Sequence, residues 1–305
     1  AKRGEYDSRV FSLRVNDKAK ERIEGLLSGS ILADDPQGLA YGLLLQSECR
    51  FWNRNLPFMF ENVGKEAGRV DELLMPADLL AEGSVLRNAV EVMTPEDCGV
   101  DDPSGNVEII GWLYQYYISE RKNEVMDGFK KNHKAGAEEI PAATQLFTPD
   151  WIVRYLVQNT VGRLWVRSHP DSQLSKNWEY YIQPSENDSA GNEDILNIQA
   201  PEDLTVCDSA CGSGHMLTYA FDLLYEIYEE EGYAPSDIPG LILKHNLYGM
   251  EIDERAANLA AFALTMKARS RSRRFFKRQV EPNIQRIVPI AFKEDEVAEL
   301  NDLYQ

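Results

Sequence analysis

The sequence predicts an α/β fold, with a parallel sheet in the C-terminal half and a helical region before it. Three observations lead to this prediction. A short apolar run at residues 204–207 meets Asp208 and enters a turn of small residues. A second apolar run, Leu247–Glu251, ends at an acid and passes into an alanine-rich segment. Residues 1–130 instead show helical periodicity with little strand signal.

The helical region is expected to form a domain of its own, residues 1–135. Asp34-Asp35-Pro36 and Asp101-Asp102-Pro103 are turn signals, and residues 123–140, which are polar and contain two glycines, suit a loop or linker. The expected helices in this part of the chain cover residues 16–27, 39–53 and 107–129.

Residues 136–305 are expected to form the second domain. Thr148 can cap a helix, with Pro149 in its first turn. A polar segment at 183–202 then leads, as a surface loop, to the sheet. Beyond it, the pattern predicts strands at 204–207, 247–251 and 284–290, and helices at 215–230, 238–244 and 253–269.

Composition limits the classes of protein that fit. The chain has 305 residues, is 43% hydrophobic and has no apolar run long enough for a membrane helix, so a cytoplasmic protein is expected. Its four scattered cysteines argue against a disulfide framework, and Cys207 with Cys211 lacks a second pair at zinc spacing, so no metal is expected. A net charge of −18 opposes unaided binding to nucleic acid.

Two acids end the first two predicted strands. The carboxyl ends of neighbouring parallel strands form a crevice for ligands, so Asp208 and Glu251 should face the same ligand. The turn that follows Asp208 contains Gly212 and Gly214 but is not the GxGxxG pattern that seats a pyrophosphate. A carboxylate at this place repels phosphate and suits the ammonium and sulfonium of S-adenosyl-L-methionine, while Glu251 suits the hydroxyls of its ribose. An ordinary strand-to-helix corner is the alternative interpretation.

Three motifs together resemble a known family. They are Phe147-Thr148-Pro149, the run from Asp208 to Gly214 (DSACGSG) and the run from Gly249 to Asp253 (GMEID). They resemble the F-T-P, D-P-A-C-G-S-G and G-x-E-I-D motifs of DNA amino-methyltransferases, with Ser209 in place of the usual proline. With IGWLYQYYISERK, PAATQLFTPDWIV and DERAANLAAFALTMKAR, the chain resembles PglX, the adenine-specific DNA methyltransferase family of BREX phage defence, over roughly residues 40 to 290.

The resemblance implies a Rossmann-like fold that binds S-adenosyl-L-methionine. The FTP residues would line the methionine end of the cofactor, the glycine turn would meet its amino group and adenosine, Glu251 would hold the ribose, and Ile252 would pack on the adenine. The expected cofactor-binding residues are Phe147, Thr148, Pro149, Asp208, Ala210, Gly212, Ser213, Gly214, Glu251 and Ile252.

The family's catalytic box, [DNS]-P-P-[YFW], is absent because the sequence has no Pro-Pro pair. The acid that usually contacts the adenine amine is also missing after the third predicted strand. The chain is therefore expected to be a fragment that is inactive alone and contains no catalytic residue. Its parent would transfer a methyl group to adenine N6 in DNA, with DNA and other phage-defence components as partners.

The basic run Lys267–Arg278 holds seven cations in twelve residues. Arg271, Arg273 and Arg274 are candidates for phosphate contact, and a solvated helix end is the plainer interpretation. Two other functions stay open. The chain could be a non-catalytic interaction module of a defence complex, or part of an RNA or small-molecule methyltransferase.

Overall fold

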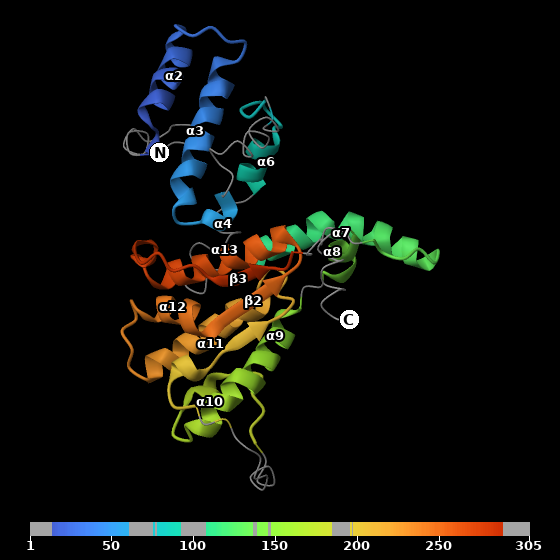
Figure 1. The fold of residues 1–305 in the computed structure, drawn as a ribbon, viewed down its shortest axis with the longest axis vertical. Coiled ribbons are helices and arrows are strands. Elements are labelled where there is room, and N and C mark those ends of the chain that lie inside the picture. Colours follow the sequence, from blue (N-terminus) through green and yellow to red (C-terminus); the bar gives the residue numbers. More distant parts are fainter. Residues whose placement is uncertain are drawn as a thin grey trace, which may run out of the picture. The chain divides into compact units, whose positions relative to one another are not determined.

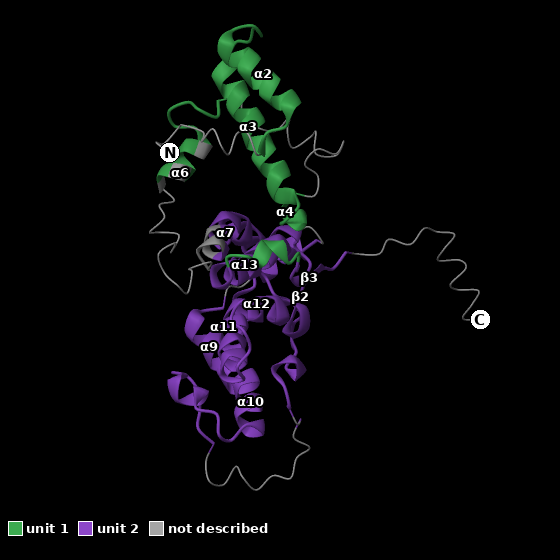
Figure 2. Cartoon of the chain, turned by 90° about the vertical axis from the view of Figure 1, so that its left-hand side faces the viewer, with its two compact units in different colours: residues 1–109, 273–279 green, residues 110–272, 280–305 purple. Residues whose placement is uncertain are grey.

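The computed structural model describes residues 14–60, 76, 78–92, 108–136, 139–145, 148–184, 196 and 198–288. The chain divides into two compact units, coloured separately in Figure 2. Unit 1 comprises residues 1–109 and 273–279, and unit 2 comprises residues 110–272 and 280–305. Helices predominate in both units, and the described strands belong to unit 2.

The described elements of unit 1 are helical (Figure 1), and they are α2 (Asp17–Ser28), α3 (Pro36–Asn53), α4 (Pro57–Phe60), α6 (Val85–Val92) and the short turn η7 (Phe275–Lys277). Helix α7 (Glu108–Lys130) begins two residues before unit 2 and lies in it from residue 110.

The other helical elements of unit 2 are α8 (Ile140–Thr144), α9 (Asp150–Val157), η2 (Gln158–Gly162), α10 (Arg163–Ser168), η3 (Leu174–Asn177), η5 (Pro201–Asp203), α11 (His215–Glu230), α12 (Ile238–Leu241), η6 (Ile242–Asn246) and α13 (Glu254–Arg271). Its strands are β1 (Val206–Asp208), β2 (Leu247–Glu251) and β3 (Asn283–Arg286).

Helices α2 and α3 form the packed core of unit 1. Ala19, Ile23 and Leu26 recur every three or four residues on one face of α2, which buries them against Ala40. The Asn16 side chain caps α2 by accepting from the Ala19 N–H at 2.9 Å. Local sequence thus defines α2 almost completely.

One expectation about a helix start and one about a loop were wrong. Helix α3 begins at Pro36 rather than at Leu39, because Asp35 caps it and proline is well suited to the first helical position. The helix expected at 107–129 is confirmed as α7, Glu108–Lys130, so residues 123–130 are helical and the loop expected at 123–140 does not include them. The polar side chains of this stretch instead pair along the helix, as Lys130 does with Asp127 at 2.8 Å.

The sheet of unit 2 has three parallel strands in the order β1-β2-β3. Strand β2 and helix α11 have the predicted limits, and β1 includes Asp208 as its last residue. The third strand is shorter than predicted and ends at Arg286, and residues 289–290 lie outside the described part. The predicted α/β character is confirmed as a small parallel sheet within a mostly helical chain.

Helices α11 and α13 pack against the sheet and against each other. The fully buried side chains of α11 include Leu217, Phe221, Leu224 and Tyr228, which recur at helical spacing. Helix α13 buries alanines instead, including Ala256 and Ala260. Small side chains allow α13 to approach the start of α11 closely.

Asn246, the residue before β2, is completely buried and ties three segments together. Its amide donates to the carbonyls of Pro201 and Leu204, both at 2.7 Å, and its oxygen accepts from the Tyr228 hydroxyl at 2.9 Å. A buried polar side chain is stable only when its hydrogen bonds are made. Asn246 therefore holds the segment that leads into β1 close to the start of β2 and to helix α11.

Helix α9 does not begin as predicted. Its first residue is Asp150, and Pro149 occupies the capping position without a side-chain hydrogen bond, so Thr148 is not the cap. Asp150 still lies in the first turn, where it pairs with Arg154 at 2.7 Å. The extended backbone of Pro149 places Thr148 outside the helix.

Along the sequence, the boundaries between the two compact units fall after residue 109 and on either side of residues 273–279. The predicted division into functional domains at residue 135 stays a prediction. Among the described residues, no helix has the length and apolar character needed to cross a membrane.

Replacement of Asn246 by alanine is expected to destabilise the chain by roughly 3 kcal/mol or more. The change leaves the Leu204 carbonyl and the Tyr228 hydroxyl without this partner, and the Pro201 carbonyl keeps only the Leu204 N–H. Each unsatisfied buried group costs about 1–3 kcal/mol. Urea unfolding measures the loss, and Gln199→Ala, at an exposed position of the same unit, is the control. Equal stability of the two variants would contradict the role of Asn246.

Candidate functional site

The carboxylate of Glu251 lies at the tip of β2 and holds the turn after β1 by hydrogen bonds. Its Oε2 accepts from the Gly212 N–H at 2.7 Å, and its Oε1 accepts from the N–H groups of Ile252 and Asp253 at 2.9 and 3.0 Å. The side chain is only 7% exposed. A buried carboxylate is stable here because three backbone donors stabilise its charge.

Asp208 and Glu251 lie on the same face of the sheet. Asp208 pairs with Gly249 in the parallel register, and Glu251 follows Gly249 by two residues. Laterally paired residues share a face, as do residues two apart in a strand. Partial burial raises the pKa of the Asp208 carboxyl, and the nearby Glu251 charge raises it further, while a hydrogen bond from Ala210 lowers it. The two acids therefore concentrate negative charge at this edge.

The glycines of the turn serve different purposes. Gly212 and Gly214 have φ angles of +54° and +87°, which glycine adopts without strain. A Cβ at Gly214 would come within 3.0–3.1 Å of Ala260, so this glycine allows α13 to pack closely. A Cβ at Gly212 would meet nothing within 4 Å. The turn therefore borders open space at Gly212, where a ligand could approach its backbone.

Helix α7 covers part of this turn. A Cβ at Gly111 would lie 2.7 Å from the Ser213 Oγ and 2.9 Å from the His215 Nε2, closer than atoms normally approach. Ser213 is 6% exposed, and its hydroxyl has no hydrogen-bond partner in the structure. A buried hydroxyl without a protein partner has hydrogen-bonding capacity left for a water or a ligand.

Asp253 joins α7 to the predicted motifs, which the sequence pattern did not reveal. Its Oδ1 caps α13 by accepting from the Arg255 N–H at 2.8 Å, and its Oδ2 accepts from the Tyr114 hydroxyl and from the Gln145 Nε2, the latter at 3.1 Å. Lys122 donates to the Gln145 carbonyl at 2.7 Å. The only signal in the sequence was the position of Asp253 at the end of GMEID.

These contacts bring the segment before the FTP motif to the tip of β2. Gln145 is buried, and Thr148 and Pro149 follow it by three and four residues. Phe147 lies outside the described residues. Among the other candidates, Ala210 and Ile252 are exposed, and Ile252 directly follows Glu251.

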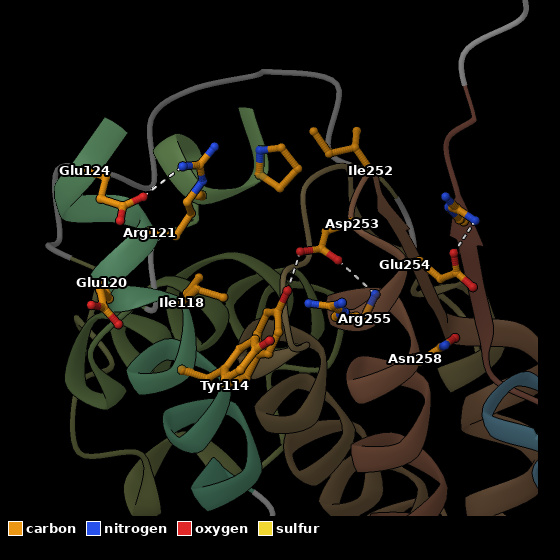
Figure 3. A pocket seen from close by; sticks show the side chains of 14 residues that line it. Tyr114, Ile118, Glu120, Arg121, Glu124, Ile252, Asp253, Glu254, Arg255 and Asn258 are labelled. Atoms are coloured by element: carbon orange, nitrogen blue, oxygen red, sulfur yellow. Dashed lines mark hydrogen bonds and ion pairs between the residues drawn. The ribbon is translucent and has the colours of Figure 1, made fainter. Parts of the chain in front are cut away.

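An open pocket of about 970 Å³ adjoins this site (Figure 3). Its walls come from α7, α8, the start of α13 and the tip of β3, and include Tyr114, Tyr117, Pro141, Ile252, Asp253 and Arg286. Figure 3 shows Tyr114 reaching Asp253, which in turn contacts Arg255. Of the predicted cofactor residues that the structure describes, Ile252 alone lines the pocket. It thus lies beside the glycine turn and does not contain it.

Arg286 is the last residue of β3, near the position at which the family resemblance implies an acid that contacts the adenine amine. It pairs in register with Glu251, and its guanidinium contacts the Glu254 carboxylate at 2.5 Å. The acid at this edge of the pocket therefore comes from the first turn of α13.

The candidate phosphate-binding arginines fall into two groups. Arg271 lies 3.7 Å from Asp222 and 4.6 Å above the Tyr225 ring, so it joins α13 to α11. Arg273 and Arg274 are exposed. Within the same basic run, Lys267 is buried and bonded to Asp222. The run therefore includes structural cations as well as exposed ones.

Cys49, Cys207 and Cys211, the described cysteines, are not in disulfides. Burial raises the pKa of Cys211 to about 12, and the charges of Asp208 and Glu251 add to this effect. At neutral pH its thiol is protonated and is a poor metal ligand. Within the described residues, no cluster of His, Cys, Asp and Glu suits a metal ion.

Comparison with known proteins gives relatives for most of the chain. It is 47% identical over 284 residues to the adenine-specific methyltransferase BrxX of Escherichia coli O9:H4 (strain HS), and 38% identical over 271 residues to the adenine-specific methyltransferase PglX of Lacticaseibacillus casei (strain Zhang). The matches cover 90% and 85% of this chain. The chain is a relative of PglX and BrxX.

The predicted resemblance to the PglX family is thereby confirmed. The chain spans 22% of the length of either relative. A more distant match, 27% identical over 54% of the chain and 14% of the relative, is a putative type II restriction enzyme and methyltransferase of Methanocaldococcus jannaschii. No protein-family model matches the chain.

The contact of α7 with the glycine turn can be tested with two glycines of the same helix. Gly111→Ala is expected to lower the melting temperature, because its Cβ would collide with Ser213 and His215. Gly128→Ala has only ordinary contact, 3.5 Å to His133, and should stabilise the helix by about 0.5–1 kcal/mol. Thermal unfolding measures both. Equal stabilisation by the two changes would show that Gly111 of α7 is not in close contact with Ser213 and His215.

Proposed function

We propose that this chain forms the S-adenosyl-L-methionine site of an adenine-specific DNA methyltransferase. The main support is the placement of Asp208 and Glu251 at the ends of adjacent strands, on either side of one turn. Glu251 itself holds this turn by accepting from the Gly212 N–H. The relatedness to PglX and BrxX supports a methyltransferase, and hence a methyl donor. The bound cofactor would supply an electrophilic methyl group.

The residues present fit this cofactor. Its sulfonium and ammonium carry positive charge, and Asp208 supplies negative charge that is partly desolvated and therefore interacts strongly. Space in front of Gly212 allows close approach to the backbone. Ser213 has a buried hydroxyl with unused hydrogen-bonding capacity. Ala210, Thr148, Pro149 and Phe147 are proposed to complete the methionine end.

Glu251 would accept a hydrogen bond from the ribose. A carboxylate offers about four lone-pair directions, and three backbone N–H groups already use this one. One direction remains for a ribose hydroxyl, so accepting both hydroxyls would require release of a backbone donor. Ile252, 41% exposed, would lie against the adenine.

We further propose that β1, β2 and β3 belong to a Rossmann-like sheet completed by segments of the parent protein. The three strands are parallel, and a helix follows each of the first two, which is the arrangement that places ligands at the carboxyl edge. Methyl transfer to adenine N6 in DNA, and a role in phage defence, would belong to the whole protein.

Isothermal titration of the chain with S-adenosylhomocysteine tests the proposed site. Saturable binding is expected, and no heat at high micromolar ligand would favour the non-catalytic interaction module. The proposal that the chain is inactive alone is tested with tritiated cofactor and DNA, where labelling of the DNA by the isolated chain would contradict it.

Asp208→Asn is expected to weaken cofactor binding at least about tenfold, since hydrogen bonds to a charged group contribute about 1.5–3 kcal/mol. Asparagine can still accept from Ala210, so the turn is kept. Asp171→Asn, at an exposed position, is the control. Unchanged affinity in the Asp208 variant would contradict the proposed contact.

The same Asp208→Asn change is expected to stabilise the ligand-free chain at neutral pH. A carboxyl with a raised folded pKa binds its proton more tightly when folded, so stability falls as pH rises from the unfolded pKa through the folded one. The variant lacks this penalty, and its advantage should vanish at acidic pH. Thermal unfolding from pH 3 to 8 measures it. The combination of higher stability and weaker binding distinguishes a ligand-binding acid from a structural one.

Arg273 and Arg274 are proposed to contact DNA phosphates. Arg273→Gln with Arg274→Gln in the whole protein should reduce the slope of log affinity against log salt by about 2, because each phosphate contact contributes about 0.9. Lys131→Gln with Lys134→Gln removes two exposed cations elsewhere and is the control. Arg271 is left intact because it binds Asp222. An unchanged slope would refute the contact.

A further inference from the structure

One face of helix α7 runs along the whole candidate site. Gly111, Tyr114, Ile118 and Lys122 share this face, because eleven residues make about three helical turns. Gly111 lies against Ser213, and Tyr114 donates to Asp253. Ile118 lines the pocket, and Lys122 donates to the Gln145 carbonyl. One helix therefore contacts the glycine turn, the tip of β2 and the segment before the FTP motif.

The two oxygens of Asp253 have separate tasks. Oδ1 caps α13 through the Arg255 N–H, and a single oxygen is enough for an N-cap. Oδ2 accepts from Tyr114 and Gln145 instead. These two bonds are not needed to start the helix, so they call for another explanation.

The backbone of Asp253 leads directly to the ribose-binding candidate. Its N–H donates to the Glu251 Oε1 at 3.0 Å, beside the N–H of Ile252. A shift of Asp253 would therefore move or release the Glu251 carboxylate. The side-chain bonds at Oδ2 and the backbone bond to Glu251 thus belong to the same residue.

Both donors to Oδ2 are held firmly. Tyr114 is 9% exposed and Gln145 is 8% exposed. Burial and the bond to Asp253 raise the pKa of Tyr114, so its hydroxyl is protonated and donates at neutral pH. The Gln145 Nε2 donates to Asp253 at 3.1 Å, and Lys122 holds the backbone carbonyl of the same residue at 2.7 Å. The Gln145 Oε1 is buried without a hydrogen-bond partner in the structure, so the bond to Asp253 orients the side-chain amide.

We propose that Tyr114, Gln145 and Asp253 form a positioning triad that holds Glu251 in the orientation for the cofactor ribose, so that helix α7 sets the cofactor affinity. The proposal rests on the proposed function of the site. None of the three residues needs to touch the cofactor, because each acts through the Glu251 carboxylate.

The triad predicts how two substitutions combine. In the whole protein that contains this chain, Tyr114→Phe removes only the hydroxyl, and Asp253→Ser keeps a capping oxygen but loses the second one. Each change is expected to weaken S-adenosylhomocysteine binding about tenfold. If Tyr114 acts through Asp253, the double variant should bind no more weakly than Asp253→Ser alone. Tyr116→Phe, on the same helix and 82% exposed, is the control and should bind normally.

Titration calorimetry measures the affinities, and hydrogen–deuterium exchange of the ligand-free protein measures the positioning directly. Tyr114→Phe should speed exchange in peptides covering 208–214 and 251–255, whereas Tyr116→Phe should not. Independent, multiplying losses of affinity, or unchanged exchange in Tyr114→Phe, would overturn the triad. If the unaltered protein bound no cofactor, the proposed function would fall and the affinity role with it, and exchange would still report whether Tyr114 orders the Glu251 segment.

Discussion

The buried Glu251 carboxylate, with three backbone N–H groups donating to it, is the interaction on which the site depends. Glu251 is the last residue of β2 and precedes the start of α13. Its carboxylate accepts hydrogen bonds from Gly212, in the turn after β1, and from Ile252 and Asp253. Three donors compensate the cost of burying the charge. Loss of the carboxylate would release the turn at Gly212 and the start of the path into α13 together, so substitutions at this position are expected to change folding as well as binding.

Asp208 shows the opposite balance. It accepts one backbone hydrogen bond, at 3.2 Å, and lies within the field of Glu251, so its charge is poorly compensated in the ligand-free chain. A cation placed between the two acids would relieve this repulsion. Functional sites commonly retain such unfavourable groups because a ligand compensates them. The asymmetry between the two acids is the physical basis for the cationic ligand that we propose at this edge of the sheet.

Helix α7 connects the region before the sheet to the site itself. Residues 108–109 fall in unit 1 and the rest of α7 in unit 2, and its Tyr114 face lies against Asp253 and the glycine turn. The path from α7 to Glu251 runs through Tyr114 and Asp253, whose backbone N–H donates to the Glu251 carboxylate.

The sequence by itself determined β2, α11, the parallel arrangement and the convergence of Asp208 and Glu251, because these depend on local hydrophobic pattern and on strand ends. It misjudged the start of α3 and the cap of α9, and it left residues 123–130 between a helix and a loop, because proline, glycine and polar residues allow either a helix or a turn. Only the tertiary structure identified the bonds of Asp253 to Tyr114 and Gln145. These partners lie 139 and 108 residues away in the chain, and no periodic pattern records a contact over such a separation.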